Sequence, residues 1–240
     1  MKEVYDKKKK VFLVLKIIFI ILIVLSANAL FSWHNEKKEI LRELDSVDDL
    51  LTKEYVEGEM VYTLDKRINY HNKDTVAWLI VEGTRINYPV VQTTNNNYYL
   101  NHNYLEEKSS AGWIFMDSDN KLTDQNIIIY GHHRKDGIMF GDIDKLMKKK
   151  YYKDHDGKIT LVIGEENRVY QVFSVYEAKA DDMYNKNNYS DFEDALTTFK
   201  EKSIIDFDTD LTGVKEIITL STCHNNNKDR LVVQAYRKMS

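Results

Sequence analysis

An almost unbroken apolar run from Val11 to Phe31 gives this chain two parts that must fold in different surroundings. About 20 helical residues at about 1.5 Å each span about 30 Å, the thickness of the hydrocarbon layer of a bilayer. Lys16 is the one charge in the run, and it lies near an end, from which a lysine can reach the interface. The run therefore predicts a transmembrane helix.

The charges on either side of the run predict its orientation. Lys7–Lys10 precede it, whereas the residues after it carry charges of both signs. The positive-inside rule then places the N-terminus in the cytoplasm and the rest of the chain outside. Ala27-Asn28-Ala29 is a small-x-small pattern that a signal peptidase can cut. We favour a retained anchor, because the apolar run is long for a cleaved signal.

Charge and cysteine content exclude several classes of function for the remaining chain. The net charge is −4, and the first ten residues carry five lysines against two acids, so the rest carries −7. An acidic body argues against nucleic acid as a partner. The chain has one cysteine, which excludes an intramolecular disulfide and a cysteine-based metal cluster.

The sequence after the apolar run predicts short strands with a few helices. Residues 36–53 are charged with apolar residues at helical spacing, which predicts an amphipathic helix after the anchor. Two further helices are predicted at Asp142–Tyr151 and Ser190–Glu201, the second with Ser190 as N-cap. Strands are predicted at residues 76–81, 86–91, 111–116, 126–130, 158–163, 168–177, 216–221 and 230–236. Seven or eight strands with few helices predict a β-barrel or a β-sandwich.

The single cysteine lies where a strand ends. Thr219-Leu220-Ser221-Thr222 leads from an apolar run into Cys223, and a polar loop follows. A structural cysteine would normally lie within the apolar run, whereas residues at a strand end meet solvent and substrate. A thiol becomes a useful nucleophile only as a thiolate, which requires a cation or a base nearby.

Two residues elsewhere in the chain can supply that base and cation. A second apolar strand ends at Gly131-His132-His133, and the two strand ends lie 91 residues apart in sequence, so only the fold can bring them together. Arg230 begins the strand after Cys223, where a hairpin would place it opposite the cysteine. A guanidinium at that point suits an oxyanion or a substrate carbonyl.

Together these segments resemble the sortases, and among them class B. The resemblance covers residues 40–237 and rests on Thr219–Cys223 followed by Arg230, Tyr130-Gly131-His132, Trp78–Gln92, Asn96–Leu100, Gly112–Asp117 and the helix at 190–201. The family implies an eight-stranded β-barrel with peripheral helices, here with an N-terminal helical appendage. It also implies transpeptidation outside the cell, with Cys223, His132 and Arg230 as catalytic residues.

The resemblance further implies the substrates and the residues that contact them. Cys223 would attack the carbonyl after Thr in a C-terminal sorting signal of the Asn-Pro-x-Thr type, and an amino group of peptidoglycan or its cross-bridge would resolve the acyl-enzyme. The matching substrate-contact positions are Asn96, Leu100, Tyr130, Tyr184 and Ser221. Class B enzymes need no metal, and no cofactor is expected.

Two alternatives belong to other functional classes. A papain-like cell-wall cysteine hydrolase would use the same Cys–His chemistry, but such enzymes place the cysteine at a helix N-terminus. A non-catalytic surface binding domain would have no need of an intact Cys, His and Arg. His133 and His224 are rivals to His132 as the base, and His132 is preferred because it follows Gly131 directly.

The predicted organisation follows from these observations. It comprises a cytoplasmic basic tail (1–10), a single-pass membrane anchor (11–31), a helical appendage or stalk (32–74) and an extracellular catalytic barrel (75–240). The predicted partners are secreted proteins with sorting signals, a peptidoglycan amine and the cell membrane.

Overall fold

The computed structural model describes residues 2–179, 182–224 and 229–237, and at Cys223 and His224 it describes the backbone alone. The chain divides into two compact units, Met1–Leu41 and Arg42–Ser240. The first unit consists of most of helix α1 (Lys2–Asp45). Every Val, Leu, Ile and Phe side chain of α1 between Val11 and Leu25 is exposed. Within the described residues, this is the one helix long and apolar enough to cross a membrane.

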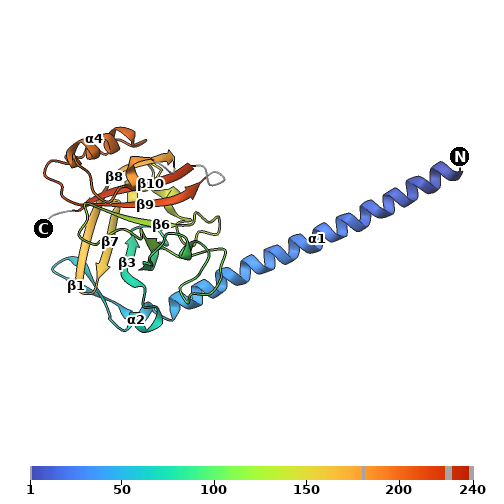
Figure 1. The fold of residues 1–240 in the computed structure, drawn as a ribbon, viewed down its shortest axis with the longest axis horizontal. Coiled ribbons are helices and arrows are strands. Elements are labelled where there is room, and N and C mark those ends of the chain that lie inside the picture. Colours follow the sequence, from blue (N-terminus) through green and yellow to red (C-terminus); the bar gives the residue numbers. More distant parts are fainter. Residues whose placement is uncertain (1, 180–181, 225–228, 238–240) are drawn as a thin grey trace. The chain divides into compact units, whose positions relative to one another are not determined.

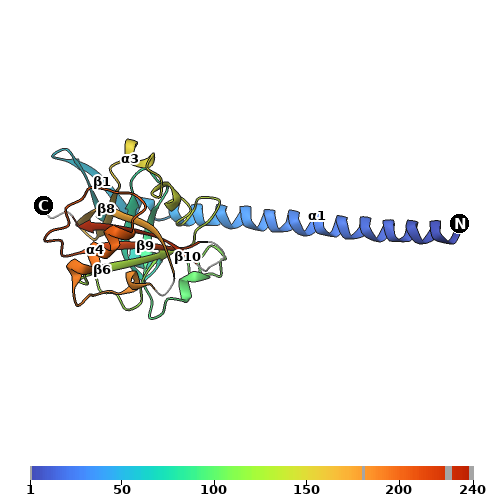
Figure 2. The ribbon, with the colours of Figure 1, turned by 90° about the horizontal axis from the view of Figure 1, so that it is seen from above.

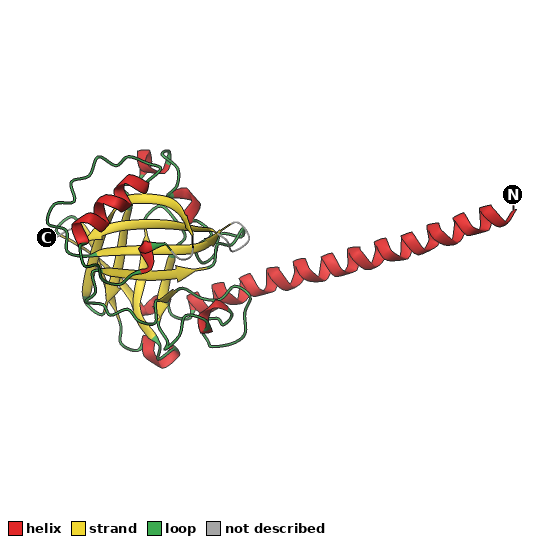
Figure 3. Ribbon diagram, turned by 45° about the horizontal axis from the view of Figure 1, so that its top comes forward, coloured by secondary structure: helices red, strands yellow, loops and turns green. Residues whose placement is uncertain are grey.

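The second unit is built on a closed eight-stranded barrel, with the strands in the order β10-β8-β7-β3-β4-β5-β6-β9 (Figure 1). The strands are β3 (Thr75–Val81), β4 (Asn87–Val91), β5 (Phe115–Met116), β6 (Asn126–Gly131), β7 (Lys158–Ile163), β8 (Glu166–Lys179), β9 (Ile217–His224) and β10 (Asp229–Arg237). Figure 3 shows these strands wrapping around one interior. The predicted mainly β fold, an eight-stranded barrel with peripheral helices, is confirmed.

Three neighbouring strands, β6, β9 and β10, are buried on both faces. Ile129, Leu220 and Val233 are paired neighbours on one face, and each is fully buried. On the other face, Asn126, Thr219 and Gln234 are also fully buried and are joined by hydrogen bonds. Burial on both faces explains why these strands read as nearly continuous apolar runs rather than alternating ones.

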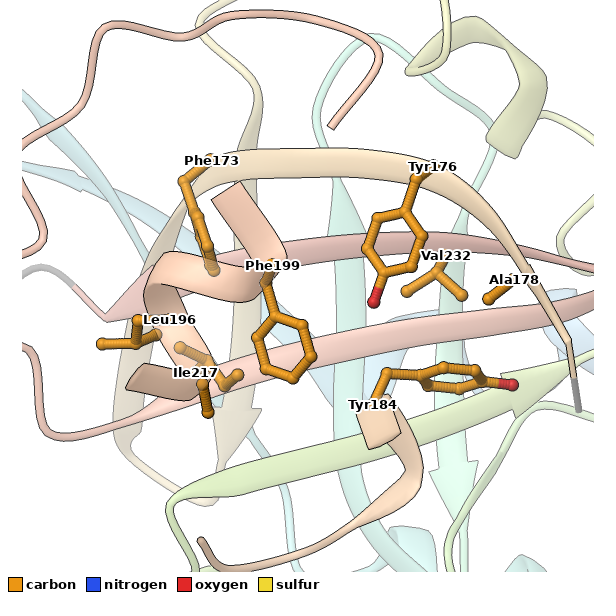
Figure 4. Close-up of a cluster of buried hydrophobic side chains, with 9 residues drawn as sticks. Phe173, Tyr176, Ala178, Tyr184, Leu196, Phe199, Ile217 and Val232 are labelled. Carbon is orange, nitrogen blue, oxygen red and sulfur yellow. The ribbon is translucent and has the colours of Figure 1, made fainter. Parts of the chain in front are cut away.

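Helix α4 (Phe192–Lys202) covers part of the outer face of the barrel beside β8, as Figures 1 and 2 show from two directions. Its buried side chains Leu196 and Phe199 pack with Ile217 of β9 and Val232 of β10. Tyr184, from the short turn η4 (Met183–Asn185), belongs to the same cluster (Figure 4). The cluster fixes the segment that carries Tyr184 onto the strands that carry Cys223 and Arg230.

Several short helices lie along the loops that connect the strands of the body. They are η1 (Asp48–Leu50), α2 (Ile68–His71), η2 (Tyr98–Leu100), η3 (Ile143–Lys145) and α3 (Tyr151–Asp154). A separate hairpin of β1 (Leu51–Val56) and β2 (Glu59–Leu64) is tied to the barrel by Asn167, whose side chain bonds both backbone groups of Tyr62.

The predicted helix over 36–53 is wrong at its C-terminal end, because α1 stops at Asp45 and Leu51 begins β1. Glu57 and Gly58 have φ values of 51° and 92°, as a two-residue hairpin turn requires, and Val56 pairs with Glu59 across it. The turn lets Leu51 and Leu64 face each other, and both are buried. A hairpin therefore takes the place of the last turns of the predicted helix.

Two other predicted helices differ in detail. Over 142–151 only η3 and the first residue of α3 are helical, because the Asp142 carboxylate bonds Arg85 instead of capping the turn. Helix α4 is confirmed, but its N-cap is Asp191, whose side chain accepts from the backbone N–H of Asp194, and not Ser190.

Candidate active site

The register of three neighbouring strands brings the candidate catalytic residues together. Cys223 in β9 pairs with Arg230 in β10. On the other side of β9, β6 runs parallel and its last residue, Gly131, pairs with Thr222. His132 and Cys223 are each one residue beyond that last pair. Because paired strands lie about 4.8 Å apart, the three backbones are adjacent across β6, β9 and β10.

The position of His132 is set by the turn η2 and by Gly112. Its Nε2 lies 2.7 Å from the backbone oxygen of Leu100. A carbonyl oxygen only accepts, so Nε2 carries the hydrogen, and Nδ1 is left to exchange a proton with a reacting group. Gly112 lies against the ring, where a Cβ would come within 3.0 Å of His132 Cδ2. The half-buried imidazole is thus oriented before any substrate arrives.

The rival base His133 is engaged elsewhere. Its Nε2 lies 2.7 Å from the Asp144 carboxylate, and its side chain is 18% exposed. This close contact directs His133 toward η3. The side chain of the other rival, His224, lies outside the described residues. Among the histidine side chains that the structure describes, His132 fits the role of base best.

The five candidate substrate-contact residues make three separate sets of polar contacts near the paired ends of β6 and β9. The Ser221 hydroxyl lies 3.2 Å from the Tyr184 hydroxyl, and Leu100 contacts His132 through its backbone. Asn96 and Tyr130 both donate to one oxygen of Asp117, at 2.8 and 3.2 Å. The structure therefore brings together residues that are up to 125 positions apart in sequence.

Electrostatics keep the Tyr130 hydroxyl protonated. Burial raises the pKa of Tyr130 far above its ordinary value, and the negative charge of Asp117 raises it further. The positive charge of Arg230 opposes this shift without cancelling it. Tyr130 is therefore a hydrogen-bond donor throughout the physiological pH range. In the described part of the chain, no group of three or more His, Cys, Asp or Glu is placed to hold a metal ion.

Comparison with known proteins identifies the family of this chain. A family model described as the sortase domain matches residues 79–238, two thirds of the chain. The chain belongs to the sortase family. Sortase B of Listeria monocytogenes is 40% identical over 171 residues, which cover 68% of this chain and 69% of that protein.

Solved structures agree with this assignment. Sortase B from Bacillus anthracis superposes with a TM-score of 0.73 at 33% identity, covering 87% of this chain and 98% of that one. A substrate complex of Staphylococcus aureus sortase B gives a TM-score of 0.66 at 33% identity, covering 72% and 83%. This sortase is therefore a class B cysteine transpeptidase. The papain-like hydrolase and the non-catalytic binding domain are not favoured.

Sequence reasoning missed two residues that shape the site of this sortase. Gly112 stands out in the sequence only as part of a motif, although its φ of +57° and its contacts with η2 give it a specific place beside His132. Asp117 is likewise part of a motif and was not a candidate site residue. A polar residue directly after the strand Phe115–Met116 was the available signal.

Proposed function

We propose that this sortase cleaves a C-terminal sorting signal of the Asn-Pro-x-Thr type after Thr and joins the released carbonyl to an amino group of peptidoglycan. The observation that carries the proposal is the register of β6, β9 and β10, in which His132, Cys223 and Arg230 follow one another across adjacent strands. The substrate complex of the related S. aureus sortase B supports a peptide signal as the acyl donor.

In the first half of the proposed reaction, the Cys223 thiolate attacks the Thr carbonyl carbon. A carbon–sulfur bond forms, and the Arg230 guanidinium stabilises the negative charge on the carbonyl oxygen. The tetrahedral intermediate collapses with cleavage of the carbon–nitrogen bond, and His132 gives a proton to the leaving amine. The product is a thioester on Cys223.

The second half reverses these proton transfers. The amine of the acceptor attacks the thioester carbonyl, His132 takes the proton that the amine loses, and the thiolate leaves as the new amide forms. Since the hydrogen bond to Leu100 occupies Nε2, the proton moves on and off Nδ1 in both halves. Tyr184 and Ser221, with Asn96, Leu100 and Tyr130, would hold the signal.

Residues 11–31 would anchor the enzyme in the cell membrane, with the tail 1–10 in the cytoplasm and the catalytic part, 75–240, outside, joined by 32–74. The apolar side chains that α1 exposes on all sides support a membrane span. The lysines that precede them support the orientation.

The test is a fluorogenic peptide assay with Asn-Pro-x-Thr and Leu-Pro-x-Thr signals, with and without an added amine. We expect cleavage after Thr and a product that carries the amine. Cys223→Ala should abolish turnover. His132→Ala should lower kcat/KM about 10²–10⁴-fold, and Arg230→Ala about 10²–10³-fold. Activity that survives Cys223→Ala, or cleavage of neither signal, would refute the proposal.

A further inference from the structure

Asp117 is a buried carboxylate, 8% exposed, directly after β5. Its Oδ2 accepts from Asn96 Nδ2 at 2.8 Å and from the Tyr130 hydroxyl at 3.2 Å. Both donors are half-buried, so they connect the carboxylate with the surface at the strand ends. One carboxylate therefore holds two of the side chains proposed to contact the signal.

The backbone of Asp117 is held independently of this carboxylate. Its N–H donates to Ile128 O at 2.9 Å, and its carbonyl oxygen accepts from Gln92 Nε2 at 2.7 Å and from Asn120 N at 3.0 Å. Its Oδ1 accepts from the N–H of Asp119, a contact that an asparagine could also make. The acceptor role of Oδ2 is therefore separable from the local fold.

The amide of Asn96 is fixed at both ends. Its Oδ1 accepts from the backbone N–H of Ser118 at 2.7 Å, and its Nδ2 donates to Asp117. A flipped amide would place its NH₂ against the Ser118 N–H and its oxygen against the carboxylate, and both contacts are repulsive. These contacts leave one hydrogen of Asn96 Nδ2 and one lone pair of its Oδ1 for a ligand. This donor and this acceptor match the C=O and N–H groups of a peptide or side-chain amide.

We propose that Asp117 is a positioning and specificity-determining residue of this sortase, which orients Asn96 and Tyr130 so that they recognise amide groups of the sorting signal. The proposal rests on the proposed function, since it needs a peptide signal bound at this strand end. It assigns to Asp117 no contact with the reacting atoms. Its effect should therefore fall on signal recognition and leave the thiol chemistry intact.

Asp117→Asn tests this role because it changes an acceptor into a donor at nearly constant size. With its oxygen toward Asp119 N, the new amide would point its NH₂ at the Asn96 and Tyr130 donors. Asn96 can relieve this conflict only by meeting the Ser118 N–H with its own NH₂. The substitution thus disturbs the orientation of Asn96 and leaves the backbone contacts of residue 117 in place.

The measurement is kcat and KM of the full chain in detergent micelles with the Asn-Pro-x-Thr peptide. We expect Asp117→Asn to lower kcat/KM about 10–100-fold, mainly through KM. The rate at which Cys223 reacts with a small methanethiosulfonate reagent should not change. Asp119→Asn, at an exposed aspartate two residues away, is the matched control and should behave as wild type.

A double-variant cycle separates positioning from general damage. If Asp117 acts through Asn96, the effect of Asp117→Asn on KM should shrink to less than about threefold in an Asn96→Ala background. An unchanged KM in Asp117→Asn would overturn the proposal. So would a loss confined to kcat, or an effect of equal size in both backgrounds.

A swapped pair keeps the test valid if Asp117→Asn alone fails to fold. With Asn96→Asp and Asp117→Asn together, the carboxylate now at position 96 accepts from Ser118 N and from the new amide, so complementary contacts return. The double variant should unfold cooperatively on heating, because its contacts are complementary. Its KM should stay above that of wild type, because position 96 no longer has a side-chain N–H for the signal. A wild-type KM in the swap would overturn the proposal. An inactive wild type would instead refute the proposed function.

Discussion

At the scale of single residues, the orientation of His132 depends on a neighbour without a side chain. Gly112 has a φ of +57°, and a Cβ there would come within 2.5 Å of Tyr99 O and 2.9 Å of Leu100 O. These are carbonyls of the turn that holds the imidazole. The left-handed backbone and the close approach together require glycine at this position.

Gly112→Ala should therefore impair catalysis as well as stability. The left-handed conformation and the contacts should cost about 1–3 kcal/mol of unfolding free energy. Displacement of the ring should lower kcat/KM by at least about tenfold. Gly213→Ala is the control, since Gly213 has a φ of +75° but nothing within 4 Å of its Cβ. Urea unfolding measures the stability of both variants, and peptide kinetics measure their activity. If both variants lost stability and kept full activity, this account would be contradicted.

The sequence predicted the residues that carry reactive groups. It did not predict the residues that orient the side chains of the site. Cys223, His132 and Arg230 were visible because each lies at the end of an apolar strand. Asp117 and Gly112 act on Asn96, Tyr130 and His132 through contacts that only the folded chain creates. The sequence offered only an indirect signal for Asp117, its place directly after the strand Phe115–Met116.

At the scale of elements, the loop after β6 is clamped to the turn between β3 and β4. The Asp142 carboxylate accepts from Arg85 Nη2 at 2.6 Å and from Arg85 Nε and the Arg85 backbone N–H, both at 3.0 Å, and Lys145 adds a fourth donor. The Tyr88 hydroxyl accepts from Met139 N in the same loop. This loop begins at His132, so the clamp supports the base from outside the site.

The clamp gives the fold a dependence on pH. Burial would raise the pKa of Asp142, but hydrogen bonds from Arg85 and Lys145 outweigh it and hold the pKa well below 3.8. A lowered carboxyl pKa contributes stability that is complete above the unfolded value, near 3.8, and is lost as the pH falls through the lower folded value.

Asp142→Asn should thus lower the unfolding free energy by about 1–3 kcal/mol at neutral pH. The difference from wild type should shrink below about pH 4, because the carboxyl group then protonates in the unfolded chain while it stays ionised in the folded protein. Urea unfolding between about pH 7 and about pH 3 measures both effects, with exposed Asp154→Asn as the control. A difference that stays constant across this range would contradict the assignment of the effect to the carboxylate.

The sequence predicted strands and helices correctly where one face or both faces of the segment are buried. It failed where a turn determines whether a segment is helix or hairpin. The strands at 126–130 and 158–163 were predicted almost to the residue. The hairpin 51–64 was missed because Glu57-Gly58 is a weaker hairpin signal than Asn-Gly. Leu50 and Leu51 also continue the helical spacing of the apolar residues in the preceding α1, which favoured a longer helix.

At the scale of the whole molecule, the parallel pairing of β6 with β9 is the feature that creates the site. Asn126–Gly131 and Ile217–Thr222 pair residue by residue although they lie 91 positions apart. Local propensity contains no information on such a pairing, so a barrel and a sandwich both remained open from the strand pattern. The family resemblance supplied the barrel, and the structure confirms it.

The membrane anchor is the prediction that concerns the chain as a whole. The full chain expressed in bacteria should remain in membranes after an alkaline carbonate wash, whereas a chain without residues 1–31 should be soluble and still cleave the peptide. The N-terminal sequence of the membrane-bound protein tests the alternative. An N-terminus just after Ala29 would show that the apolar run is a cleaved signal.

The most direct test of the account is the intact mass of the enzyme after reaction with an Asn-Pro-x-Thr peptide in the absence of added amine. We predict a mass increase equal to the acyl part of the signal, located on Cys223 by peptide mapping and removed when an amine is added. The increase should be absent in Cys223→Ala. Signal cleavage without any acyl-enzyme, or an adduct on another residue, would contradict the proposed mechanism.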